Sequence, residues 1–176
     1  MFRHITISAF LLAWMSLGSH AWAQKKEIII LEPDLMSIPE RDFYIKDVVN
    51  DREEPYASLG TVYTGLFGRE KQLVLLDGVE QGLESYLQKA LPRMEGDVGV
   101  TMVVQELYVD ESKGASKKGE MTLKVRFVHD ALRNYTTQAA FEYSNANPTL
   151  TYEKILKKTI ALVMETYAEE GPTLEK

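Results

Sequence analysis

The C-terminal part of the sequence constrains the fold most, because it predicts an amphipathic helix that needs a sheet to cover. We expect this helix to begin near Asn147 and Pro148 or at Thr151, and to end at Gly171 and Pro172, since glycine and proline are strong stop signals. Between these limits apolar residues recur at the period of an α-helix. The stripe consists of Tyr152, Ile155, Leu156, Thr159, Ile160, Val163 and Tyr167. A stripe this regular typically packs on a sheet.

Three segments upstream have the two-residue alternation of β-strands. Residues 98–109 are apolar on both faces in part, which predicts a central strand. Residues 121–128 and 137–143 alternate cleanly between apolar and polar side chains. The polar loop 110–119 makes the first two segments a predicted hairpin. Shorter extended segments are predicted at residues 28–31, 43–49, 59–67 and 72–76, the first of them as a buried strand.

A second helix is predicted between the short strands and the long ones. Asp77 and Glu80 have the spacing of a capping box at its start, and Pro92 ends it. Its apolar face consists of Val79, Leu83, Tyr86, Leu87 and Ala90. The pattern as a whole predicts an α+β fold, with a mostly antiparallel (or mixed) sheet and two helices packed on one face.

The N-terminus has the order of parts found in a secretory signal peptide. A basic start with Arg3 is followed by the apolar run 5–17, and Ala21 and Ala23 supply the small residues of a cleavage site. The apolar run is shorter than the roughly 20 residues that a spanning helix needs. We therefore expect residues 1–23 to be a signal peptide cleaved near Ala23. Residues 24–176 would then form a single α+β domain, soluble in the periplasm or secreted.

The residue inventory excludes several kinds of chemistry. The chain has no cysteine, so it has no thiol nucleophile, no disulfide and no cysteine-based zinc site. Of its three histidines, only His129 lies beyond the predicted signal peptide. We therefore expect no metal and no cofactor, and we identify no catalytic residue. The formal net charge of −6 argues against nucleic acid as a partner.

The densest charged turn is the best candidate for a binding site. Asp51, Arg52 and Glu53 follow a predicted strand directly and could form a recognition loop, or they could be a solvated turn. A third reading pairs carboxylates such as Asp47, Asp51 and Glu53 for hydrolysis, which needs two acids at a fixed separation. His129 with Asp130 has the look of a base and its orienting acid, but neighbours on a strand point to opposite faces.

The order of elements carries a resemblance to a known family. A strand that ends in a "V-x-D-x-R"-like segment, Val48 to Arg52, is followed by a helix at 78–91, the long strand 98–109 and its hairpin partner 122–128. This pattern, over roughly residues 43–143, resembles the auxiliary envelope lipoproteins of ABC-type lipid transport systems in Gram-negative bacteria. The resemblance implies a non-enzymatic role in binding a partner protein or a lipid-handling complex. The anchoring cysteine of those lipoproteins is absent here.

The sequence thus leaves three functions open. The first is a periplasmic accessory or binding protein of the cell envelope, without enzymatic activity, that binds an envelope protein. The second is a binder of a small apolar molecule or lipid, with a pocket between sheet and helices. The third is a carboxylate-based hydrolase.

Overall fold

The computed structural model describes residues 25–39, 41–65, 67–114, 118–129, 134–144 and 150–172. The predicted signal peptide, its cleavage site near Ala23, and Asn147 and Pro148 lie outside these ranges. The elements follow one another as β1 (Lys26–Ile29), β2 (Phe43–Asn50), β3 (Thr61–Thr64), β4 (Arg69–Leu75), α1 (Val79–Ala90), β5 (Val98–Glu111), β6 (Lys118–Val128), β7 (Asn134–Ser144) and α2 (Tyr152–Glu170).

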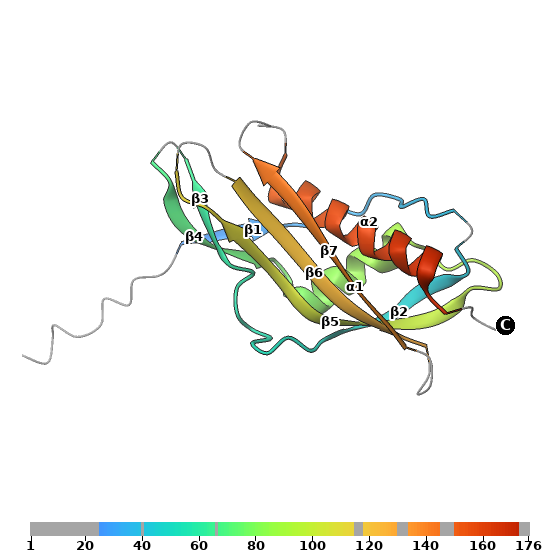
Figure 1. Cartoon of the computed structure of the whole chain (residues 1–176). Coiled ribbons are helices and arrows are strands. Elements are labelled where there is room, and N and C mark those ends of the chain that lie inside the picture. The colour runs from blue at the N-terminus through green and yellow to red at the C-terminus, as the bar shows by residue number, and fades with distance from the viewer. Residues whose placement is uncertain are drawn as a thin grey trace, which may run out of the picture.

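The strands form two mixed sheets (Figure 1). The smaller sheet has the order β1-β4-β3, in which β1 and β4 are parallel and β3 and β4 antiparallel. The larger has the order β2-β5-β6-β7, with β2 parallel to β5 and the other pairs antiparallel. The predicted α+β class, the mixed pairing, the central position of β5 and the β5–β6 hairpin are confirmed. The division into two sheets is a further feature that the alternation did not indicate.

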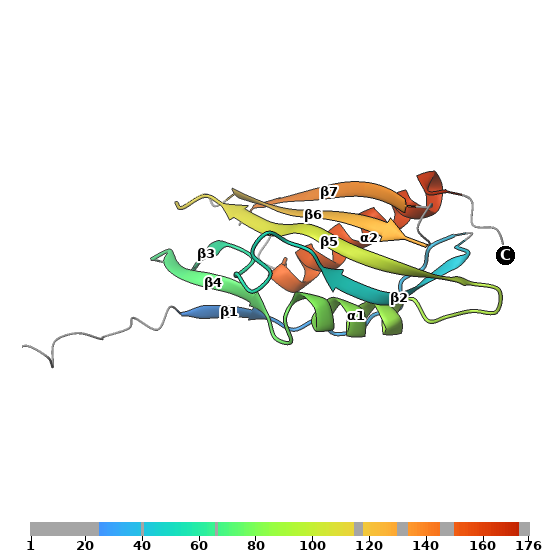
Figure 2. The ribbon, with the colours of Figure 1, turned by 90° about the horizontal axis from the view of Figure 1, so that it is seen from below.

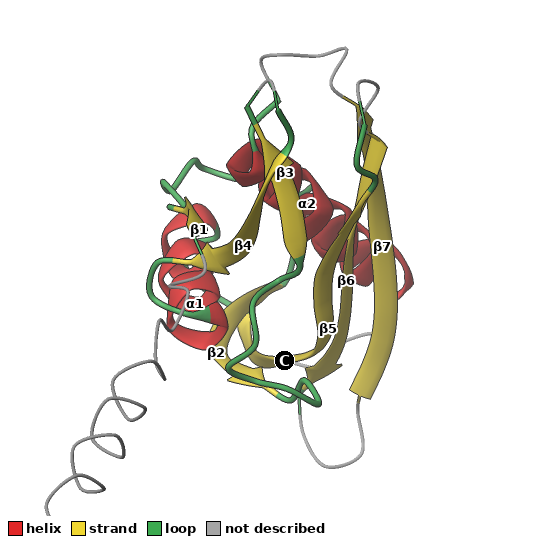
Figure 3. Cartoon of the chain, turned by 90° about the vertical axis from the view of Figure 1, so that its left-hand side faces the viewer, coloured by secondary structure: helices red, strands yellow, loops and turns green. Residues whose placement is uncertain are grey.

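The two sheets meet where β5 passes the segment that leads into β3. The N–H of Val109 donates a 2.6 Å hydrogen bond to the carbonyl of Leu59, whose own N–H donates to Leu73 of the small sheet. The next residue, Gly60, has φ of 130° and lies so close to the Val109 carbonyl that a Cβ there would clash with it. Glycine is therefore needed at this crossing. Beyond it the sheets diverge toward the end of β5 (Figure 3).

The helices lie beside each other on the same side of the larger sheet (Figure 2), α1 against β2 and α2 against β6 and β7. Near the end of α2, the ring of Tyr167 stacks on Phe127 of β6 at 4.1 Å between centroids and meets Phe43 of β2 edge-on at 4.8 Å. These contacts fix the C-terminal half of α2. Neither helix in the described part of the chain is long and apolar enough to cross a membrane.

Of the two starts that the sequence allows for α2, the structure shows the one at Thr151. Thr151 precedes the first helical residue, and its hydroxyl accepts a 3.3 Å hydrogen bond from the N–H of Lys154. The predicted cap of α1 is wrong, because Gly78 rather than Asp77 holds the N-cap position and no side chain caps that helix. Asp77 lies one residue too early to reach the first turn.

Candidate binding cleft

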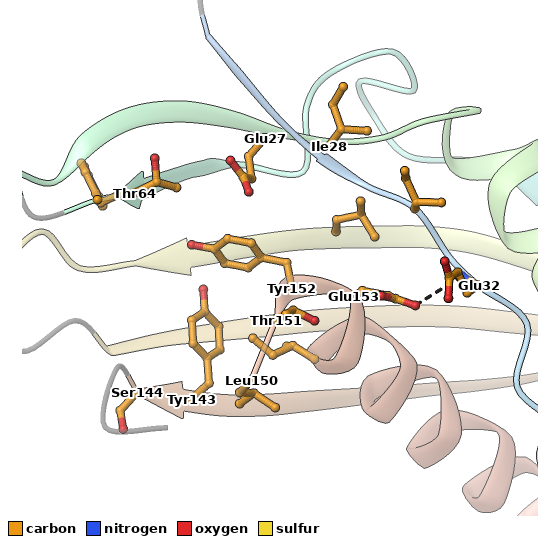
Figure 4. A pocket seen from close by; sticks show the side chains of 15 residues that line it. Glu27, Ile28, Glu32, Thr64, Tyr143, Ser144, Leu150, Thr151, Tyr152 and Glu153 are labelled. Carbon is orange, nitrogen blue, oxygen red and sulfur yellow. Dashed lines mark hydrogen bonds between the residues drawn. The ribbon is translucent and has the colours of Figure 1, made fainter. Parts of the chain in front are cut away.

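A cleft of about 730 Å³ opens where the two sheets diverge, between the small sheet and the start of α2 (Figure 4). Its walls come from β1, β3, the end of β7 and the first turn of α2. The lining is part apolar, part phenolic and part acidic. It consists of Glu27, Ile28, Ile29, Ile30, Glu32, Tyr63, Thr64, Gly65, Tyr143, Ser144, Leu150, Thr151, Tyr152, Glu153 and Ile155.

A buried carboxylate, Glu111, joins three of these walls. It is the last residue of β5, and only 7% of it is exposed. One oxygen accepts a 2.9 Å hydrogen bond from the N–H of Tyr63 on β3. The other accepts bonds from the phenols of Tyr143 on β7, at 2.9 Å, and Tyr152 on α2, at 2.7 Å. Glu111 therefore sets the relative position of β3, β7 and α2.

The two phenols are held as neutral donors. Burial, together with the Glu111 carboxylate, raises the pKa of Tyr143 and that of Tyr152 well above the ordinary value of 10. Their rings meet edge-on, with centroids 6.1 Å apart. In Figure 4 both hydroxyl groups point toward the same region.

The ring of Tyr143 lies across a glycine of the neighbouring strand. Gly119 on β6 is paired directly with Tyr143, and a Cβ added at Gly119 would clash with the ring and hydroxyl of the tyrosine. An aromatic ring that covers a cross-strand glycine compensates for the missing side chain. The space left by Gly119 thus determines the position of the Tyr143 ring and of its hydroxyl group.

The acidic residues of the cleft are partly neutralised from outside it. Glu27 pairs with Lys71 at 2.6 Å, and Glu153 pairs with Lys157 at 2.7 Å. Glu153 also accepts a 3.3 Å hydrogen bond from the N–H of Glu32, the dashed line in Figure 4. This bond connects the first turn of α2 to the chain just beyond β1.

The structure places the predicted site residue Arg52 away from this cleft and in its own loop. Its Nε donates to the Asn50 side chain at 2.9 Å, and its Nη2 donates to the carbonyl of Pro55 at 2.7 Å. A longer bond of 3.4 Å reaches the carbonyl of Leu107 on β5. Burial lowers the pKa of Arg52. These contacts hold the turn against the larger sheet.

The carboxylates of the predicted site are exposed. Asp51 keeps 59% of its side-chain surface exposed and lies 4.0 Å from Arg126, while Glu53 and Asp47 are also exposed. This is not the arrangement of two acids facing each other across an enclosed cleft. His129 is half-buried, and Asp130 lies outside the described residues.

Sequence reasoning missed Glu111, although a signal for it exists. Leu107, Val109 and Glu111 lie two residues apart on β5 and all three are buried. A carboxylate that continues the buried face of a strand needs hydrogen-bond donors around it. Tyr63 and Tyr143, which hydrogen-bond to Glu111, lie outside the helices and also line the cleft. Among the described residues, no group of three or more acidic, histidine or cysteine side chains is placed to hold a metal ion.

Comparisons with known proteins give no family for this chain. No family model matches it, and no curated protein does. The crystal structure of an uncharacterized protein is similar over 83% of this chain and 95% of its own, with 11% sequence identity and a TM-score of 0.42. Similarity at this level indicates neither a family nor an activity. The resemblance to the transport auxiliary lipoproteins stays a prediction.

Proposed function

We propose that this chain is a binding protein of the bacterial cell envelope, and that its partner or ligand occupies the cleft around Glu111. The observation that carries the proposal is the Glu111 centre itself. One buried carboxylate fixes three separate elements at the base of an open cleft whose walls combine isoleucine, leucine and tyrosine side chains. Such a mixture of apolar surface and a few fixed polar groups is typical of binding sites.

Binding suits this site better than catalysis does. A general base must reach the proton that it takes, whereas the Glu111 carboxylate is buried and accepts hydrogen bonds from its own protein. Tyr143 and Tyr152, with raised pKa values, serve poorly as bases near neutral pH. Their role is to hold the walls of the cleft in place.

The export signal and the family resemblance support a location in the envelope. The predicted signal peptide would deliver residues 24–176 to the periplasm, and the resembled lipoproteins act there as non-enzymatic accessories. We accordingly propose an envelope protein as the partner, bound without covalent chemistry.

Affinity capture with a matched pair of variants tests this function. Thr64→Trp places a large ring at the β3 wall of the cleft, whereas Gln138→Trp places the same ring at an exposed position of β7 outside it. We expect the parent chain and Gln138→Trp to recover the same envelope protein, and Thr64→Trp to lose it, as read by mass spectrometry. Equal recovery by all three forms would contradict a role for the cleft.

A small amphipathic molecule is the second candidate. The cleft volume of about 730 Å³ lies within the range of ordinary small-molecule sites, roughly 300–1,000 Å³. Native mass spectrometry of the purified chain would reveal such a molecule as an added mass. That mass should be absent from Thr64→Trp and present in Gln138→Trp.

A further inference from the structure

The backbone of β1 presents an open edge. The carbonyls of Lys25 and Ile29 accept hydrogen bonds from Gln72 and Leu76, at 2.9 and 3.0 Å. In the parallel register of β1 and β4, the odd-numbered residues of β1 therefore bond to β4, and the N–H and C=O groups of Lys26 and Ile28 point the other way. Among the described strands, β1 pairs with β4 alone and ends its sheet.

This open edge forms one rim of the cleft. The Ile28 side chain is 51% exposed and points away from the cleft in Figure 4, yet Ile28 is part of the lining. Ile28 therefore lines the cleft with its backbone and not with its side chain. Three residues beyond β1, the N–H of Glu32 already has a partner across the cleft, the Glu153 carboxylate of α2. A strand edge thus faces α2 across the cleft, and Glu153 closes one end of it.

The acidic lining of the cleft favours an occupant that carries positive charge. Its described lining residues include three carboxylates, Glu27, Glu32 and Glu153, and no lysine, arginine or histidine; Lys71 and Lys157 pair with Glu27 and Glu153 from outside the lining and offset part of this charge. Glu27 points from β1 into the cleft toward Tyr152 in Figure 4. On a strand added beside β1, the residue next to Glu27 would point inward as well, and opposite charges at such cross-strand positions attract.

We propose that the cleft takes an extended segment of a partner polypeptide, which adds to the open edge of β1 as a fourth strand and directs a lysine or arginine toward Glu27. This inference rests on the proposed function and specifies the partner's chemistry. Strand addition uses main-chain hydrogen bonds for affinity and alternate side chains for specificity. β1 has four residues. Because paired strands have nearly the same rise, about 3.3 Å per residue, the added segment would have about four to five residues.

The acidity of the chain disfavours a second copy as the occupant. The chain carries a net charge of −6, and pairing of β1 with the β1 of another copy would bring the Glu27 residues and both acidic clefts together. Repulsion between like charges opposes that arrangement. A basic, extended segment has the complementary charge.

Hydrogen exchange with defined peptides tests the proposal on the purified full-length chain. The probes are a short blocked peptide of alternating valine and lysine, its valine–glutamate counterpart, and a form of the first with methylated backbone nitrogens. Measured by NMR, the lysine peptide should slow exchange of the Lys26 and Ile28 amides, and its affinity should exceed that of the other two by about tenfold or more. Equal affinity of the lysine and glutamate peptides, or of the methylated peptide, overturns the proposal.

A pair of variants at one residue tests the edge directly. The N–H of Ile28 does not bond to β4, so Ile28→Pro removes an edge donor while leaving the β1–β4 pairing its hydrogen bonds, and edge strands tolerate proline. Ile28→Ala shortens the same side chain and keeps the N–H. We expect Ile28→Pro to lower the affinity for the lysine peptide about tenfold, and Ile28→Ala to change that affinity little. Equal losses in both variants overturn strand addition.

The outcomes separate this inference from the proposed function. If Thr64→Trp abolishes envelope capture but the lysine peptide does not protect the β1 amides, the cleft binds something other than an extended basic segment. If Thr64→Trp leaves capture unchanged, the proposed function fails too. A dimer in size-exclusion chromatography that dissociates in Ile28→Pro would show a second copy on the edge and overturn the inference.

Discussion

The phenol of Tyr152 donates a 2.7 Å hydrogen bond to the carboxylate of Glu111, which ties the first residue of α2 to the last residue of β5. This bond crosses from the helix layer to the sheet at the base of the cleft. Glu111 and Tyr152 are 41 positions apart in the sequence. The cleft therefore depends on a long-range polar contact rather than on a local motif.

Replacement of this carboxylate should destabilise the fold. Glu111→Gln keeps the shape but places an amide N–H₂ among hydrogen-bond donors, so at least one buried donor loses its acceptor. We expect a loss of about 1–3 kcal/mol in the free energy of unfolding, measured in urea. Glu106→Gln on the same strand is the control, because its partly exposed pair with Lys124 should be worth no more than about 1 kcal/mol. Equal losses would contradict the role given to Glu111.

The two cleft phenols should make the protein less stable at high pH. Their pKa values are raised in the folded state, so above the unfolded value of about 10 the unfolded chain releases protons that the folded chain keeps. The contribution is complete below about pH 10 and is lost as pH rises through the folded pKa. We expect the free energy of unfolding to fall above pH 10 by up to about 1.4 kcal/mol per pH unit for each phenol.

Phenylalanine variants identify the groups responsible for this pH dependence. Tyr143→Phe and Tyr152→Phe should each make the fall above pH 10 shallower in urea denaturation. Some dependence should remain in both, because burial also raises the pKa of Tyr167 to about 12. Tyr56→Phe, at a fully exposed position, should leave the slope unchanged. A slope that no cleft variant alters would exclude these phenols as its source.

Much of the fold could be predicted from the sequence because its signals are local. The alternation in β6 and β7, the hairpin loop and the stripe of α2 each depend on neighbours within a few residues. The pairing of β1 with β4 does not, since any short apolar strand satisfies the same pattern. The run at residues 28–31 was expected to be a buried strand, yet only Ile29 of it is fully buried while Ile28 and Ile30 are about half exposed.

The cleft could be predicted less well from the sequence, because its residues come together through long-range contacts. Asp51, Arg52 and Glu53 stand out by charge density, but charge density marks exposed turns as well as binding sites. Glu111 stands out only when the burial of β5 is known, and the described residues that hydrogen-bond to it, Tyr63, Tyr143 and Tyr152, lie on three other segments of the chain. Its position in the hydrogen-bond network, rather than its residue type, gives it importance.

Two glycine substitutions should have opposite effects on stability. Gly119→Ala forces the Tyr143 ring from its place, so we expect a loss of about 1–3 kcal/mol. Gly82→Ala in α1 meets only ordinary contacts, 3.7 Å or more from Leu75, and should stabilise the fold by about 0.4–1 kcal/mol. The cost of Gly119→Ala should shrink in a Tyr143→Ala background, a coupling that a double-mutant cycle measures. An undiminished cost would mean that the clash with Tyr143 is not its cause.

Arg52 should act on the stability of its turn, and the two acids beside it should not. Lysine cannot reproduce the divergent hydrogen bonds from Nε and Nη2 to Asn50 and Pro55, so Arg52→Lys should cost about 1–2 kcal/mol. Asp51→Asn and Glu53→Gln alter exposed side chains and should change the free energy of unfolding by less than about 0.5 kcal/mol. Thermal unfolding of the three variants measures this difference.

Envelope capture with the same variants tests the turn as a recognition loop. If Asp51→Asn and Glu53→Gln leave stability intact but abolish capture, the partner binds at this turn rather than in the cleft. If all three variants retain capture, the contribution of Arg52 is to hold the turn against β5.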